Sequence, residues 1–145
     1  MGTKKRLDVS SLQEGTTLYE MKKEVVQENI NLYAEASKDF NPIHINEEFA
    51  RNTPLGGTIA HGMLILAYVS QMMTANFGQV WLTSGKLNTR FKAPARPGDT
   101  VTISGTVKKL ETTEEGTSVK CNVLCQNQSG ETVISGDASI VLSGC

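Results

Sequence analysis

A long apolar run between Ile59 and Phe77 is the feature that most constrains the fold of this chain. Its residues are helix formers, and from Met63 to Met73 most of them are apolar on every side of a helix. A helix that is apolar all round is buried all round, and this one is shorter than the roughly 20 residues of a membrane span. The run therefore predicts a long helix inside the protein, which starts after a Gly-Gly pair with Thr58 as its cap.

The chain after this run is typical of strands. Leu87, Thr89 and Phe91 alternate with polar residues, as on a strand with one buried face, and a proline- and glycine-rich turn follows. Three further strands are expected, over residues 100–111, 117–128 and 131–143. One buried helix with four or five antiparallel strands predicts an α+β fold, a curved sheet wrapped round the helix. Because the edges of such a sheet are open, we expect dimerisation by edge pairing or helix contact.

The segment before the run predicts shorter elements. Residues 15–26 alternate imperfectly and favour a first strand. Residues 27–37 carry apolar side chains at helical spacing, and this helix must end near Asp39 because a proline follows at Pro42. Residues 45–53 favour one short helix, with Asn46 as its cap.

Length and composition exclude several classes of protein. The 145 residues suit a single domain over 1–145, with residues 1–14 as a candidate flexible segment. A net charge of −1 gives no reason to expect nucleic acid as a partner. No segment suits a membrane span, and no apolar stretch follows the basic N-terminus as in a secretory signal. Three cysteines, none at metal-ligand spacing with a histidine, favour reduced thiols in a cytoplasmic protein without a metal site.

The stretch "SKDFNPIHINEEF" (residues 37–49) places an acid, Asp39, close to a base, His44, and the chain has only 2 histidines. Asp and Asn are common in turns, so the residues alone fit a polar turn at least as well as a catalytic pair. A carboxylate and an imidazole are also the groups that general acid–base chemistry uses most. The residues by themselves leave both interpretations open.

Two segments, "ASKDFNPIHINEEFA" and "GGTIAHGMLILAYVS", together resemble the MaoC-like (R)-specific enoyl-CoA hydratases and related acyl-thioester dehydratases. The family pattern is approximately small-x-Asp-x-Asn-Pro-aliphatic-His, followed by His-Gly-Met at the start of an apolar helix. The resemblance covers roughly Gly15 to Leu142, and Lys38 departs from it where many members have glycine. It implies a hot-dog fold, in which an antiparallel sheet wraps round a long central helix.

The resemblance also implies roles for named residues. Asp39 and His44 match the catalytic dyad, and Asn41 and Pro42 match the residues that shape the loop between them. Gly62 matches the glycine whose backbone N–H faces the thioester oxygen. A glycine at the start of a helix also permits tight packing, and the two interpretations are compatible. Which member of the dyad is the base stays open.

Other residues carry weaker expectations. Ser70 matches a helix serine near the dyad, although a serine in a buried helix often bonds back to a carbonyl one turn earlier. His61 competes with His44 for the role of base but matches a mainly structural family position. Four basic residues suit the phosphates of coenzyme A or an acidic carrier protein, or else simply a solvated strand face: Lys86, Arg90, Lys92 and Arg96.

The resemblance therefore implies an enzyme, a hydro-lyase that adds water reversibly to trans-2-enoyl-CoA and gives (R)-3-hydroxyacyl-CoA. The nearest alternative is the (R)-3-hydroxyacyl-ACP dehydratase of fatty acid synthesis, followed by a hot-dog thioesterase and a non-catalytic acyl-CoA-binding subunit. No cofactor is expected, since coenzyme A or acyl carrier protein enters only as the carrier of the substrate. The expected partners are an acyl thioester and a second copy of the chain.

Overall fold

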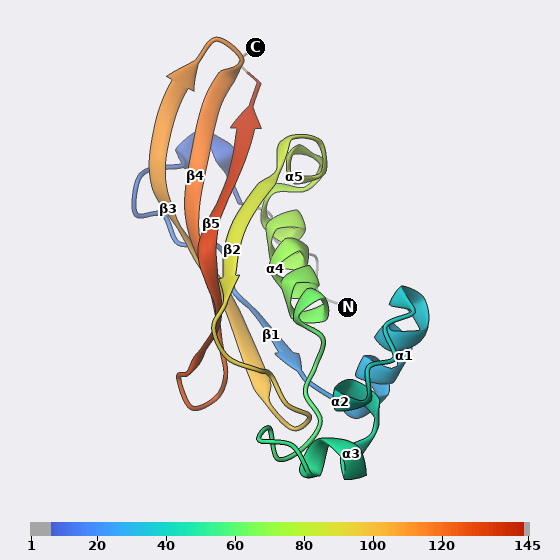
Figure 1. The fold of residues 1–145 in the computed structure, drawn as a ribbon. Helices are drawn as coiled ribbons and strands as arrows, with labels where there is room; N and C mark the ends of the chain where they lie inside the picture. Colours follow the sequence, from blue (N-terminus) through green and yellow to red (C-terminus); the bar gives the residue numbers. More distant parts are fainter. Residues whose placement is uncertain (1–6, 144–145) are drawn as a thin grey trace, which may run out of the picture.

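A five-stranded antiparallel sheet in the order β1-β3-β4-β5-β2 forms one layer of this protein (Figure 1). A computed structural model describes residues 7–143. The strands are β1 Met21–Glu24, β2 Lys86–Phe91, β3 Thr100–Thr113, β4 Gly116–Gln126 and β5 Thr132–Leu142. The helices are η1 Val9–Ser11, α1 Gln27–Ser37, α2 Pro42–Ile45, α3 Glu47–Arg51, α4 Gly62–Phe77 and α5 Gln79–Ser84. The predicted α+β class is confirmed.

The central helix α4 lies along one face of the sheet (Figure 1). Its buried side chains include Ile65, Val69 and Met73, which join the inward-facing residues of β3, β4 and β5 in one core. The predicted burial of this helix on all sides is wrong for the single chain, because Met63 is 58% exposed. Only the side of α4 that meets the sheet is fully covered, and the opposite side remains partly open.

The helices α1, α2 and α3 gather at the end of the molecule where α4 begins (Figure 1). Asn46 caps α3 as predicted, because its side chain accepts a hydrogen bond from the N–H of Phe49 at 3.0 Å. The short helix α2 was not expected from the sequence. It forms because Asn41 caps it and Pro42 occupies its first position, where a missing N–H costs nothing.

Three predicted boundaries differ from the structure. The first strand is only β1, and its predicted start contributes a single bridge between Thr17 and Thr106. The central helix begins at Gly62, so Thr58 is not its cap; the Thr58 hydroxyl instead lies within hydrogen-bonding distance of Gln27 and Glu47. The sequence after α4 was expected to be strand, yet α5 precedes β2 there and buries its tryptophan.

The described part of the N-terminal segment, residues 7–14, contacts the folded body. The N–H of Leu7 donates to the carbonyl of Asn76 on α4 at 3.0 Å, and Leu7 and Leu12 pack against the core. Residues 1–6 lie outside the described part, as does Cys145.

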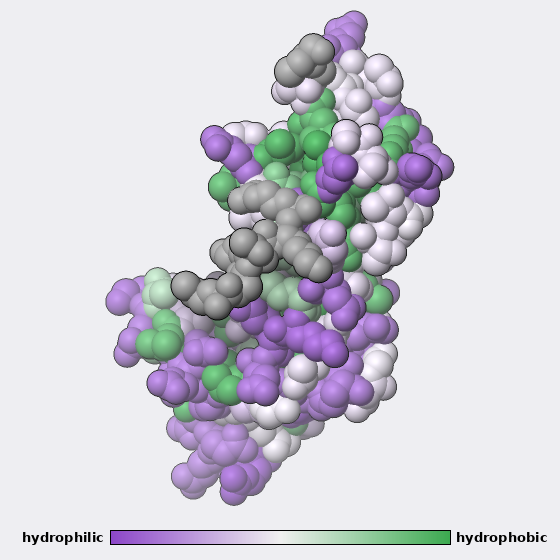
Figure 2. Space-filling view, turned by 180° about the vertical axis from the view of Figure 1, so that it is seen from behind, coloured by the Kyte–Doolittle hydropathy of each residue, from purple (hydrophilic) through white to green (hydrophobic). Residues whose placement is uncertain are grey.

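The surface is unevenly polar. Seen from behind, hydrophilic residues dominate the lower half, and hydrophobic residues gather in the upper half, toward the end that carries α5 (Figure 2). Of the helices within residues 7–143, none has the length and apolar character needed to cross a membrane.

Candidate active site

The loop between α1 and α2 places Asp39 beside the start of α2. The chain leaves α1 through Lys38, whose φ of 64° and ψ of 21° are left-handed, a conformation that costs a side-chain-bearing residue energy. An Asp39 carboxylate oxygen then accepts a hydrogen bond from the N–H of Asn41 at 3.2 Å, and the Asn41 side chain accepts one from Ile43 at 3.2 Å. These local bonds fix the turn and leave the Asp39 side chain exposed.

The imidazole of His44 is held in one tautomer. His44 is 8% exposed, and its Nδ1 lies 2.9 Å from the carbonyl oxygen of Ile59. Because a carbonyl oxygen only accepts, Nδ1 must carry the proton and donate it, which leaves Nε2 for chemistry. The backbone of His44 is held as well, since Gln27 donates to its carbonyl at 2.8 Å.

A second network supports this loop from behind. Thr58 is buried, and both its N–H and its hydroxyl lie within hydrogen-bonding distance of the Glu47 carboxylate, at 3.2 Å and 3.0 Å. Both bonds from Thr58 stabilise the charged Glu47 carboxylate and so lower its pKa. The bond from the backbone N–H has the larger effect. Thr58 directly precedes Ile59, so the network steadies the carbonyl that orients His44.

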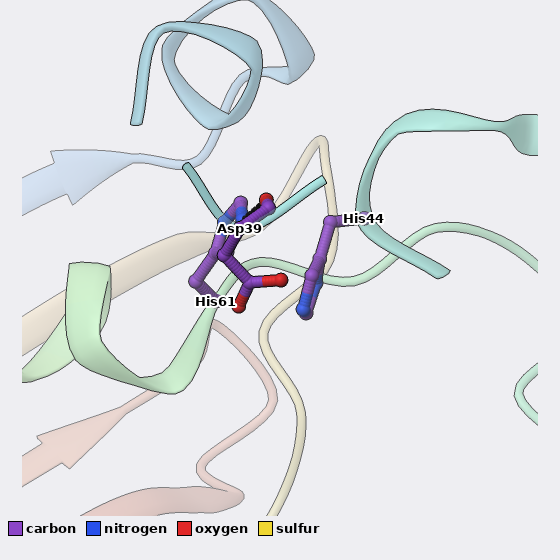
Figure 3. Close-up of side chains that lie close together, drawn as sticks. All are labelled: Asp39, His44 and His61. Atoms are coloured by element: carbon purple, nitrogen blue, oxygen red, sulfur yellow. Dashed lines mark hydrogen bonds between the residues drawn. The ribbon is translucent and has the colours of Figure 1, made fainter. Parts of the chain in front are cut away.

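Figure 3 shows the Asp39 carboxylate turned toward the imidazole of His44, with His61 beside them. One carboxylate oxygen and one ring nitrogen of each histidine lie within 4.8 Å of one another. The sequence pointed to Asp39 and His44 and ranked His61 lower. The one signal for His61 in the sequence was its position next to Gly62. The contact of His61 with Asp39 and His44 depends on the fold.

The same three groups have the spacing to hold a divalent ion. However, the rings of His44 and His61 are stacked, with centroids 3.9 Å apart and planes 25° apart. Lone pairs lie in the ring planes, so those of stacked rings run side by side, and one ring would have to turn before both bound one metal.

Gly62 begins α4 next to this cluster. The first bonds inside the helix run from Leu64 and Ile65 to the carbonyl of His61, so the N–H groups of Gly62 and Met63 precede the helical ladder. A Cβ at Gly62 would lie 3.0 Å from the ring of Phe91, closer than a side chain normally fits. Glycine thus keeps the approach to this helix N-terminus open.

An apolar pocket of about 350 Å³ opens at this point of the molecule. Gly62 and Ile65 of α4, Phe91 of β2 and Leu55 from the loop before α4 contribute to its wall. The pocket also includes Ile59, whose carbonyl binds His44, so it lies next to the polar cluster. Its lining suits an apolar chain that ends near the N-terminus of α4.

One of the four basic residues predicted to bind substrate lies at the apolar pocket. Lys92 lines the apolar pocket. Lys86 and Arg90 alternate with Leu87, which packs against the core, so they point to the opposite face of the sheet. Arg96 lies in the following turn, where its N–H donates to Asp99 at 2.9 Å. Of the four, only Lys92 is placed at the pocket.

Ser70 makes a different contact from the predicted one. Its hydroxyl accepts a hydrogen bond from the indole N–H of Trp81 at 2.9 Å, which ties α4 to α5. It lies eight residues beyond Gly62, about 12 Å along the helix at a rise of about 1.5 Å per residue. The structure brings Asp39, His44 and Gly62 together and leaves Ser70 in a packing contact.

Known proteins share both the sequence and the architecture. Residues 8–128 match the family model of the MaoC like domain. The (R)-specific enoyl-CoA hydratase of Rhodospirillum rubrum is 34% identical over 123 residues, 83% of this chain and 81% of that protein. A mitochondrial 3-hydroxyacyl-[acyl-carrier-protein] dehydratase of Arabidopsis thaliana is 31% identical, over 79% of this chain and 69% of its own length.

Among solved structures, the (R)-hydratase from A. caviae involved in PHA biosynthesis superposes with a TM-score of 0.78. That comparison covers 91% of this chain and 98% of the other, at 26% identity. The hot-dog architecture expected from the sequence is therefore confirmed.

Proposed function

This chain belongs to the family of MaoC-like domains, and from that membership we propose that it is an (R)-specific enoyl-CoA hydratase. The reaction is the reversible addition of water to trans-2-enoyl-CoA to give (R)-3-hydroxyacyl-CoA. The observation that carries the proposal is the convergence of Asp39 and His44 on one point beside the N-terminus of α4.

Two proton transfers fall to this pair. As the water oxygen bonds to C3, one of its O–H bonds breaks and the electrons of the C2=C3 bond move toward the thioester carbonyl. When the carbonyl re-forms, C2 takes up a proton, so water is added and nothing is oxidised or reduced. One member of the Asp39–His44 pair removes the water proton, and that proton is returned to C2 through the pair, which thus ends the cycle in the protonation state in which it began.

The N-terminus of α4 supports the intermediate charge. Negative charge develops on the thioester oxygen as C3 is attacked, and the Gly62 N–H lies ahead of the helical ladder. A backbone donor at the positive end of a helix stabilises such an oxyanion, and one donor is worth about 3 kcal/mol of barrier. In this mechanism side chains and backbone supply all the chemistry, and coenzyme A acts only as the carrier.

The apolar pocket beside Gly62 receives part of the acyl-thioester chain in this proposal. Its lining by Leu55, Ile65 and Phe91 favours a hydrocarbon, and Lys92 at its wall offers a positive charge to the carrier. Lys92 is the one we assign to substrate binding, because the other basic residues from the sequence, Lys86, Arg90 and Arg96, do not line this pocket.

We also propose that the enzyme is a homodimer of the cytoplasm. Support for the dimer comes from β2, which ends the sheet and carries the exposed Phe91. Support for the compartment comes from Cys121 and Cys125, which are both free thiols.

The test is hydration of crotonyl-CoA by the pure protein, with chiral analysis of the product. The proposal predicts (R)-3-hydroxybutyryl-CoA. A pure (S) product would contradict it, as would a lack of turnover on every enoyl-CoA and enoyl-ACP offered. Release of free CoA without a hydrated product would instead identify a thioesterase, and tight binding without turnover a non-catalytic acyl-CoA-binding subunit.

The second candidate is the dehydratase that acts on carrier-protein thioesters, because the Arabidopsis relative is named for that substrate. Both candidates need the same Asp39, His44 and Gly62. They differ in the carrier, so kcat/KM measured on matched acyl-CoA and acyl-carrier-protein substrates separates them.

A further inference from the structure

Gln27, the first residue of α1, uses its side-chain amide to join three segments of the chain. The nitrogen Nε2 donates to the backbone carbonyl of His44 at 2.8 Å and to the side chain of Asn31 at 2.9 Å. The oxygen Oε1 accepts from the Thr58 hydroxyl at 2.7 Å. Because a backbone carbonyl only accepts, the nitrogen must face His44 and the oxygen must face Thr58. The amide therefore has one orientation, in which both its nitrogen and its oxygen are bound.

Both long-range partners of Gln27 belong to the support of the His44 imidazole. His44 bears the ring itself. Thr58 directly precedes Ile59, whose carbonyl oxygen lies 2.9 Å from Nδ1 of that ring. A shift of one segment against the other would change this distance or its angle, and a hydrogen bond weakens steeply as its geometry worsens. The position of Gln27 thus lets it set the separation between the imidazole and the acceptor that orients it.

The backbone around His44 is too short an element to keep this geometry by itself. The helix α2 has only 4 residues, about one turn, and the carbonyl groups at the end of a helix lack partners inside it. Thr58 lies in the loop between α3 and α4 and is 3% exposed. A backbone bond from Ile59 to the carbonyl of Ile43 at 3.0 Å also joins the two segments. The amide of Gln27 adds two side-chain bonds to that single backbone bond.

Glu47 also contacts Thr58, but it is the weaker support. Its carboxylate lies 3.0 Å from the Thr58 hydroxyl, against 2.7 Å for the amide oxygen of Gln27. The Glu47 side chain is 54% exposed, whereas Gln27 is half-buried, so water competes less for the bonds of Gln27. Gln27 also reaches His44 directly, and it therefore binds both sides of the support of the imidazole.

We propose that Gln27 is a positioning residue for the hydration reaction. Its amide keeps the proton of the His44 imidazole on Nδ1 and so leaves Nε2 free for the reaction. The inference rests on the proposed hydratase function. Gln27 acts through His44 and does not line the apolar pocket that we assign to the acyl chain. Its loss should therefore slow turnover and leave KM nearly unchanged.

Two substitutions of Gln27 test this role. Gln27→Glu has the same shape and keeps an oxygen for Thr58, but it offers the His44 carbonyl an acceptor in place of the donor. Gln27→Met has a similar length and removes both bonds. Gln79→Glu is the matched control, because Gln79 is the exposed first residue of α5 and takes the same change at a helix start.

The first measurement is kcat and KM for crotonyl-CoA. Both Gln27 variants should lose about tenfold in kcat, with KM within twofold of the wild type, since one misplaced hydrogen bond is worth about a factor of ten in rate. Gln79→Glu should keep both constants. If either Gln27 variant keeps a kcat within twofold of the wild type, the inference is overturned.

The tautomer of His44 gives a second readout, which a merely structural role of Gln27 would not change. The chain has only 2 histidines, so nitrogen NMR of a labelled sample on the alkaline side of neutrality can follow the ring nitrogens of each. In the wild type the proton of His44 should lie on Nδ1. In Gln27→Met a second population with the proton on Nε2 should appear. An unchanged tautomer in Gln27→Met would overturn the inference even if kcat falls.

Substitutions of Thr58 cover the case in which Gln27→Met does not fold. Thr58→Val removes the hydroxyl that Gln27 binds and should lower kcat about tenfold. Thr58→Ser keeps the hydroxyl and should retain a kcat within twofold of the wild type. Equal kcat values in the two Thr58 variants would overturn the inference. If the wild type hydrates no enoyl thioester, the proposed function itself fails, while the tautomer measurement still tests the role of Gln27.

Discussion

At the scale of single residues, Asp39 and His44 carry the proposed chemistry and lie outside the main core. Asp39→Asn and His44→Ala should each lower kcat about 100-fold or more, because each removes a proton-transfer group. Denaturant titration should show that both variants are folded, since Asp39 is exposed and His44, although buried in α2, is not part of the hydrophobic core. Asp137→Asn is the matched control, because Asp137 pairs with Lys108 on the outer face of the sheet. Near-normal turnover of either dyad variant would exclude that residue from the mechanism.

A substitution at Gly62 tests whether the start of α4 serves catalysis or only packing. Gly62→Ala adds a Cβ that would lie 3.0 Å from the Phe91 ring and crowds the approach to the N–H group. Alanine favours helix over glycine, so the variant should unfold no more easily than the wild type. We expect kcat/KM for crotonyl-CoA to fall at least tenfold. Met63→Ala, at the exposed neighbouring side chain, should leave kcat/KM unchanged, and a fall equal to that of Gly62→Ala would show that substitutions at this helix end act non-specifically.

Lys38 is the one residue other than glycine with a positive φ in the described chain. Left-handed backbone costs a residue with a Cβ about 1–2 kcal/mol, which explains the glycine that the resemblance led us to expect there. Lys38→Gly should therefore raise the free energy of unfolding by about 1 kcal/mol, measured by denaturant titration. Lys38→Ala keeps the Cβ and should give no such gain. An equal gain in both variants would point to the lost charge rather than to the backbone.

At the scale of elements, local signals predicted some helices, and long-range contacts set the boundaries of others. Asn46 and the proline after α1 are local signals, and both α3 and the end of α1 follow them. The start of α4 does not follow the cap that Thr58 offers. The Thr58 hydroxyl is engaged by Gln27 and Glu47, which lie 31 and 11 residues away in the chain. Local sequence propensity contains no information about these long-range contacts.

One buried side chain of α4 binds the chain just before β1. Asn76 is 1% exposed; its amide oxygen accepts from the Tyr19 N–H at 2.9 Å, and its amide nitrogen donates to the Tyr19 carbonyl at 3.0 Å. Asn76→Ala should lower the free energy of unfolding by about 2–4 kcal/mol, because it removes bonds made away from water. The measurement is equilibrium denaturation.

Asn29→Ala is the control for that variant, since Asn29 lies exposed in α1 and alanine is the better helix former. This change should leave stability unchanged or slightly raised. A loss below about 0.5 kcal/mol for Asn76→Ala would mean that water replaces its bonds to Tyr19 at little cost.

At the scale of the whole molecule, the sequence located the parts of the site but not their assembly. The motif residues could be assigned by resemblance, and the structure brings Asp39 and His44 together. The stacking of His61 on His44 joins residues from α2 and the start of α4, and the pocket joins the loop before α4 to β2. Such contacts depend on the packing of segments far apart in the chain. They could not be predicted from spacing along it.

The free edge of β2 gives the proposed homodimer a definite contact. The Lys92 N–H donates to the carbonyl of Val133 in β5 at 2.8 Å. N–H directions alternate along a strand, so the N–H of Arg90 points into the sheet and that of Thr89 points away from it. If a second copy pairs with this edge, Thr89 donates to the partner chain. Proline in its place removes that donor and leaves the bonds to β5 intact.

We therefore expect Thr89→Pro to run as a monomer of 15.7 kDa in light scattering after gel filtration, where the wild type runs at twice that mass. Its circular dichroism should be that of the wild type. Arg90→Pro is the matched control, because it removes a bond within the sheet and should cost about 3 kcal/mol or more in stability. A wild-type monomer would contradict the dimer. A Thr89→Pro dimer would show that the copies meet elsewhere, with the partly open side of α4 as the next surface to test.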